Sequence, residues 1–127
     1  MDATVSSDIK DQVMALIGSG NIDEAIAILI DVCSNDSDNA QIHALLGVAY
    51  QQKGDKMHAV YHFEEALRLD ESAKNYYNLG AMYELSRRID EAVRQYNMAI
   101  EMDSEYSKAK NALDRLRQSY LESIETI

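Results

Sequence analysis

The sequence of 127 residues contains no proline, no tryptophan and only one cysteine. Because Cys33 has no second thiol in the chain, an intramolecular disulfide is impossible, which excludes the small disulfide-stapled secreted domains. Long apolar runs are also missing. The longest, Ala25–Ile30, has six residues, whereas a membrane-spanning helix needs about 20. The chain opens without a basic or an apolar segment, so we expect no secretory signal and a cytoplasmic protein.

Basic residues are few, since 12 Lys and Arg face 22 Asp and Glu and leave a formal net charge of −10. An acidic chain repels phosphate backbones, and no cluster of Lys and Arg offsets that repulsion. We therefore expect no nucleic-acid partner and no membrane insertion.

The sequence repeats itself with a period of 33–34 residues. A Leu-Gly-x-x-Tyr motif at 46–50 recurs at 79–83, and Ala, aromatic and Ala positions follow each copy at the same spacing. Those positions are Ala59, Phe63 and Ala66 in one unit and Ala92, Tyr96 and Ala99 in the next. Segment 20–26 matches 54–60 at a spacing of 34. The chain is therefore predicted to contain three units, at about 6–39, 40–72 and 73–106.

Each unit is predicted to be a helical hairpin, because its apolar residues recur at steps of three and four on both sides of a turn. In the second unit the turn is Gly54-Asp55, whereas Arg87-Arg88 stand at that place in the third. Small residues such as Gly47 let the two helices approach closely. Asn21 followed by Glu24 resembles a capping box. One last amphipathic helix, at about 107–123, is predicted to cap the array.

The period, together with its Leu-Gly, Tyr, Ala, aromatic and Ala positions, resembles the tetratricopeptide repeat family. The resemblance implies an all-α fold, a right-handed α-solenoid of helix-turn-helix repeats that forms a single domain over 1–127. The first unit departs from the pattern at the positions of its first helix, and the family's junction proline is replaced in all three units. These departures are Ile9, Gln12, Val13 and Leu16, and Ser37, Glu71 and Ser104.

The resemblance also implies a concave groove, lined by one face of the first helix of each unit, that binds a segment of a protein or peptide partner. Apolar residues left bare on a soluble protein indicate such a partner, and an amphipathic helix or an extended apolar segment would fit. Alternatively, tighter coiling, inward folding of the first helix or self-association buries them. The implied groove residues are Lys10, Met14, Ile17, Ala44, Leu45, Val48, Gln52, Lys74, Tyr77, Asn78, Ala81, Leu85, Lys108 and Arg115.

One subfamily holds the C-terminal carboxylate of chaperone tails with a clamp of Lys, Asn and Arg side chains. The corresponding positions here are Lys10, Met14, Leu45, Lys74 and Asn78. Two lysines remain and three polar contacts are absent, so the fixed hydrogen-bond geometry that gives such a clamp its specificity is missing. We therefore expect an apolar or amphipathic ligand in place of an acidic tail.

Catalytic, cofactor and metal sites are not predicted. His58 and His62 lie four residues apart on one helix, but zinc usually takes three or four protein ligands, so we expect both to face solvent. His43 is expected to be a packed core imidazole and Cys33 a small buried apolar residue. The sequence thus indicates a non-catalytic interaction module or adaptor, and a small chaperone of secretion substrates is a narrower form of that hypothesis. A homo-oligomeric scaffold is the alternative.

Overall fold

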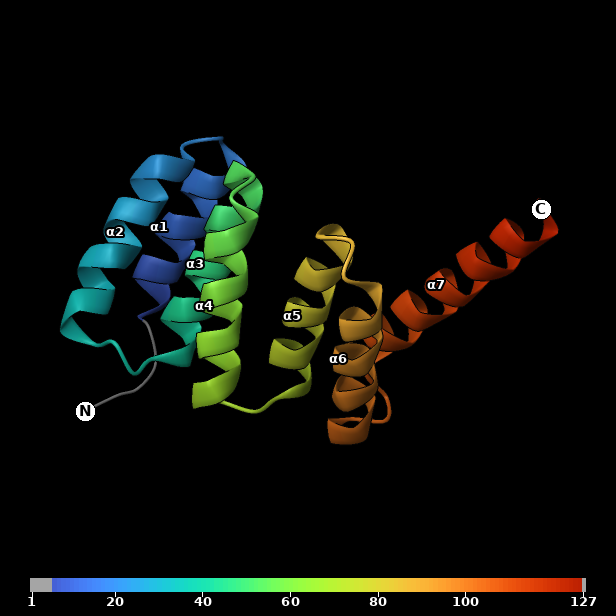
Figure 1. Cartoon of the computed structure of the whole chain (residues 1–127). Coiled ribbons are helices and arrows are strands. Elements are labelled where there is room, and N and C mark those ends of the chain that lie inside the picture. Colours follow the sequence, from blue (N-terminus) through green and yellow to red (C-terminus); the bar gives the residue numbers. More distant parts are fainter. Residues whose placement is uncertain (1–5, 127) are drawn as a thin grey trace. The chain divides into compact units, whose positions relative to one another are not determined.

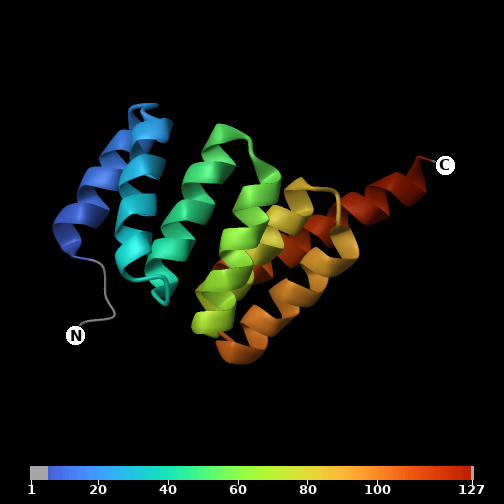
Figure 2. The same cartoon turned by 60° about the vertical axis from the view of Figure 1, so that its left-hand side comes forward.

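The computed structural model describes residues 6–126, which form seven helices and no strand (Figure 1 and Figure 2). This confirms the all-α fold class. Residues 1–5, on which the expectation of no secretory signal rests, lie outside the described part. The helices are α1 (Ser7–Gly18), α2 (Ile22–Asn35), α3 (Ala40–Lys53), α4 (Lys56–Leu69), α5 (Ala73–Leu85), α6 (Ile89–Met102) and α7 (Ser107–Glu125).

The chain divides into two compact units, Met1–Glu71 and Ser72–Ile127. From here on, these two are called the first and the second unit, and the three segments that repeat in the sequence are called repeats. The first unit contains the helices α1 to α4, and the second contains α5 to α7. That the whole chain behaves as a single domain stays a prediction.

Four of the helices have an N-terminal cap, in which a short polar side chain accepts a hydrogen bond from a backbone N–H of the first turn. Ser6 caps α1, Asn39 caps α3, Asp55 caps α4 and Ser72 caps α5. The capping box predicted at Asn21 is wrong, because this side chain makes no capping bond. Its amide nitrogen instead donates to the Ser19 hydroxyl at 3.1 Å, back toward the preceding turn.

The hairpin turns of the second and third repeats share one backbone conformation although their sequences differ. Gly54 ends α3 with a φ of 89°, and Arg87, 33 residues later, has a φ of 65°. A residue with a Cβ atom adopts this left-handed region at a cost of about 1 kcal/mol. The next residue, Arg88, holds the turn in place: its guanidinium lies 4.3 Å from the centre of the Tyr83 ring and pairs with Glu91.

The predicted close approach of the two helices of a hairpin is confirmed. A Cβ atom placed on Gly47 of α3 would lie 2.6 Å from Cε1 of Phe63 on α4, and one on Gly80 of α5 would lie 2.8 Å from Cε1 of Tyr96 on α6. Phe63 and Tyr96 are almost completely buried. The space that each glycine leaves is therefore filled by the aromatic ring of the following helix.

Apolar side chains from α1, α2 and α3 form one cluster in the first unit. The cluster includes Val13, which is fully buried although the first repeat departs from the family pattern. Its buried members are Val13, Ala25, Ile26, Leu29, Ile42, Leu45, Leu46 and Ala49.

Candidate functional site

Each repeat has a candidate binding face on its first helix, and the same burial pattern occurs on that face in all three repeats. Val13, Gly47 and Gly80 occupy equivalent positions and are buried. The next residue along each helix keeps part of its surface. Met14 is 45% exposed, and its counterparts Val48 and Ala81 are half-buried.

Within the first unit, α1 and α3 bring part of the predicted set together. Ile17 of α1 packs against the apolar cluster that contains Leu45 of α3. Leu45 differs from the expectation of an accessible groove residue, because it is only 8% exposed and belongs to the core. Ala44 is half-buried, and Lys10 and Gln52 are exposed.

In the second unit, Tyr77 of α5 belongs to an aromatic cluster, defined here as Tyr77, Tyr96 and Tyr106. The Tyr77 ring centre lies 5.7 Å from that of Tyr96 and 5.8 Å from that of Tyr106. The Lys108 ammonium lies 5.9 Å from the centre of the Tyr77 ring, within the range of a cation–π contact. Since Tyr77 is half-buried, it presents a ring with a fixed orientation and part of its surface accessible.

The other α5 residues of the predicted set differ in exposure. Leu85 is 48% exposed. Lys74 is exposed, and Asn78 and Ala81 are half-buried. An amide, an ammonium and apolar surface are therefore available on this helix to a ligand backbone or side chain.

Arg115 of α7 has a role that the sequence did not indicate. Its guanidinium pairs with the Glu84 carboxylate of α5, and Oε1 of the same carboxylate accepts a hydrogen bond of 2.7 Å from the Tyr96 hydroxyl of α6. Burial of Glu84 opposes ionisation, but the bonds from Arg115 and Tyr96 outweigh it, so the Glu84 pKa is lowered. This network joins three helices. The Arg115 guanidinium, which was expected to line the groove, is therefore paired with Glu84 within the second unit.

All three histidines of the chain belong to one stack of aromatic rings with Tyr50, on α3 and α4 of the first unit. The Tyr50 ring stacks on His58 at 4.8 Å and on His62 at 5.5 Å between ring centres. The His62 ring also stacks on His43 at 5.3 Å. The expectation of a packed His43 is confirmed, since it is 6% exposed. For His62 the expectation of a solvent-facing ring is wrong, whereas His58 is exposed.

The hydrogen bonds show which ring nitrogens of His43 and His62 carry the protons when both rings are neutral. His43 Nε2 lies 2.8 Å from the Ser37 carbonyl oxygen, which can only accept, so His43 Nδ1 carries a lone pair. His62 Nδ1 then donates to His43 Nδ1 across 3.0 Å. Burial, and secondarily the neighbouring His43 and His58, lower the His62 pKa from 6.5 to about 4.

The histidine cluster does not amount to a metal centre. Among residues 6–126, no group of three or more His, Cys, Asp or Glu side chains is arranged to hold a metal ion. His58 Nδ1 instead bonds Asp55 Oδ2 at 2.7 Å.

Cys33 of α2 has an apolar environment in the first unit. Cys33 is half-buried against the apolar cluster. Burial raises the pKa of its thiol, which disfavours the reactive thiolate.

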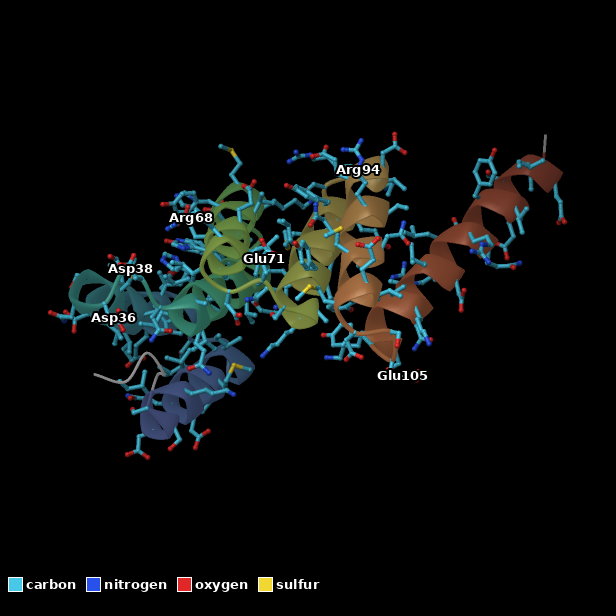
Figure 3. The ribbon with its side chains drawn as sticks, turned by 90° about the horizontal axis from the view of Figure 1, so that it is seen from below. Asp36, Asp38, Arg68, Glu71, Arg94 and Glu105 are labelled. Atoms are coloured by element: carbon cyan, nitrogen blue, oxygen red, sulfur yellow. The ribbon has the colours of Figure 1, made fainter. Side chains whose placement is uncertain are left out.

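Figure 3 shows Asp36 and Asp38 at the connection between α2 and α3, and Arg68 near the end of α4. The Arg68 pKa is raised, mainly by its hydrogen bond to Glu65 and to a lesser extent by Asp38.

Two residues of these clusters, Glu84 and Tyr106, were not predicted from the sequence. Their partners lie far away along the chain. Glu84 precedes Tyr96 by 12 residues and Arg115 by 31 residues, spacings that match no helical or repeat period. Only the packing of α5, α6 and α7 brings these groups together.

No helix within 6–126 combines the length and the apolar character that crossing a membrane requires.

The comparisons with known proteins agree on the repeat architecture. A family model described as tetratricopeptide repeat matches residues 40–72 and 73–106. No curated protein matches the chain significantly.

Solved structures similar to the chain include the first tetratricopeptide domain of Spaghetti (RPAP3) bound to the HSP90 peptide SRMEEVD, with 22% identity and a TM-score of 0.81 over 95% of this chain and 97% of that one. The second such domain of human RPAP3, in complex with the HSP70 peptide SGPTIEEVD, has 20% identity and a TM-score of 0.77, and the match covers 86% of this chain and 92% of that one. The Sgt2 tetratricopeptide domain from Aspergillus fumigatus has 18% identity and a TM-score of 0.83, and the match covers 98% of this chain and 86% of that one. At these identities the similarity concerns the fold.

Proposed function

Because the chain belongs to the tetratricopeptide repeat family, whose domains mediate protein–protein interactions, we propose that it is a non-catalytic module that binds an apolar or amphipathic segment of a partner protein. The carrying observation is the threefold pattern on the first helices. The equivalent residues Met14, Val48 and Ala81 each keep accessible apolar surface beside a buried neighbour. Apolar side chains at fixed positions on rigid helices are suitable anchors for a peptide.

The side chains at the clamp positions support an apolar ligand over an acidic one. The peptides bound by the RPAP3 domains end in Glu-Glu-Val-Asp. In this chain Lys10 and Lys74 are exposed, but Met14 and Leu45 offer no hydrogen bond to a carboxylate. The net charge of −10 also opposes an acidic tail and favours a segment whose apolar anchors are flanked by Lys or Arg.

The test is selection of peptides from a displayed random library, followed by calorimetric titration of the selected peptides. Val48→Asp should weaken binding by at least about tenfold, because it replaces one of the apolar anchors with a charge. Ile30→Asp is the matched control, since Ile30 is 51% exposed on α2 and lies outside the predicted groove. It should bind like the wild type, and all three proteins should keep the same circular dichroism spectrum.

Two outcomes would contradict the proposal. Selected peptides that end in an acidic carboxylate, with affinity dependent on Lys10 and Lys74, would indicate a clamp. Equal loss of affinity in Val48→Asp and Ile30→Asp would show that the general negative charge matters and that the apolar face does not.

A further inference from the structure

The last turns of α7 carry apolar side chains that the second unit leaves uncovered. The first half of the helix is anchored in the unit, because Ala109 and Ala112 are buried and Arg115 is paired with Glu84. In the second half, Tyr120 is 66% exposed, Leu121 is 46% exposed and Ile124 is 47% exposed. Three large apolar residues within two turns of one helix make a patch, which we call the α7 patch.

The position of the α7 patch follows from the repeat register. The first helices of the second and third repeats end at Lys53 and Leu85, and the period of 33 places the equivalent end in α7 at about residue 118. The helix continues to Glu125 and projects beyond α5 and α6 (Figure 1 and Figure 2). A helical extension with no packing partner is only marginally stable in water, so an apolar surface on it indicates that another helix covers it.

The charges around the α7 patch fit a second copy of the same helix in the opposite direction. Arg117 lies four residues before Leu121 and Glu125 lies four residues after it, so both flank Leu121 on the same side of the helix. If two α7 helices cross antiparallel with Leu121 at the twofold axis, Arg117 of each copy lies opposite Glu125 of the other. A parallel arrangement would place like charges together.

We propose that the α7 patch is a homodimer interface in which two copies pair antiparallel through Tyr120, Leu121 and Ile124. A twofold interface must be complementary to itself, and the order Arg117, apolar patch, Glu125 meets that requirement. The interface is small, so the dimer is expected to be weak and to form at high micromolar concentrations. It is separate from the groove residues of the proposed function, and either proposal can fail alone.

The first test is sedimentation equilibrium of the full chain between about 10 µM and 1 mM, where the wild type should show a monomer–dimer equilibrium. Leu121→Glu should weaken dimerisation by at least about tenfold, because it places two like charges at the twofold axis. Ser119→Glu adds the same charge on the opposite side of the same helix and should leave the dimer unchanged. Circular dichroism should confirm that both variants fold.

The second test determines the orientation of the helices. Arg117→Glu and Glu125→Arg should each weaken self-association, because each places like charges opposite one another in an antiparallel pair, whereas in a parallel pair each would only exchange one like-charge pair for another. A mixture of the two variants should form a heterodimer about as readily as the wild type forms a homodimer. Native mass spectrometry of differently tagged copies measures this directly.

Three results would overturn the proposal. They are a monomer at all concentrations, a dimer insensitive to Leu121→Glu, and a mixture of charge variants that shows no heterodimer. A dimer lost in Val48→Asp and retained in Leu121→Glu would place self-association in the groove.

Discussion

Adding one methyl group at Gly47 should destabilise the first unit, although glycine is a poor helix former. The Gly47→Ala Cβ atom would lie 2.6 Å from Cε1 and 2.7 Å from Cδ1 and Cζ of Phe63, whereas carbon atoms in favourable contact are about 3.5–4.0 Å apart. The ring would have to move by about 1 Å. Phe63 is 2% exposed, so it has no free space to move into.

The expected magnitude is the difference between two opposing effects. Alanine gains about 1 kcal/mol over glycine in a helix interior, and overpacking a close contact costs about 1–3 kcal/mol or more. Since three ring atoms lie below 3 Å, the upper part of that range applies. We expect a net loss of about 1–2 kcal/mol in the free energy of unfolding.

Urea denaturation followed by circular dichroism measures this loss, and Gly18→Ala is the matched control. Gly18 ends α1, and apart from its chain neighbours and its own helix backbone no atom lies within 4 Å of its Cβ position. The control should therefore be neutral or slightly stabilising. In a Phe63→Leu background, Gly47→Ala should cost clearly less, because the clashing ring atoms are gone. If Gly47→Ala is as stable as Gly18→Ala, the close approach of α3 and α4 is refuted.

Two further predictions concern charge and backbone conformation. Because the His62 pKa is lowered from 6.5 to about 4 in the folded protein, the unfolded chain takes up this proton first, and stability should fall by about 1–3 kcal/mol as the pH drops from 6.5 to 4. His62→Gln should remove that part of the pH dependence in denaturation curves, and an unchanged slope would contradict the burial of the ring. Arg87→Gly should raise the free energy of unfolding by up to about 1 kcal/mol by relieving the left-handed φ of 65°. Thermal denaturation measures this change in stability. If Arg87→Gly is less stable than the wild type, the Arg87 side chain stabilises the turn by more than its left-handed backbone conformation costs.

Periodicity made the repeats and their helices predictable, because apolar residues at steps of three and four report local geometry. It also located Gly47 and Gly80 at the close contacts. The same reasoning failed where a side chain had two local options, as at Asn21, which bonds Ser19 and caps nothing. It failed again at Leu45, because the pattern of one helix does not show how deeply a neighbouring helix covers its edge.

The 33–34-residue period alone identifies this protein as an array of helical hairpins of the tetratricopeptide type, since the repeated positions show which residues of the second and third repeats face the partner helix. Which polar groups meet depends on how the helices pack against one another. Glu84, Tyr96 and Arg115 come from three helices, and His43 and His62 are 19 residues apart, so no local spacing encodes their contacts. The packing of helices against each other lowers the His62 pKa and leaves the last turns of α7 bare.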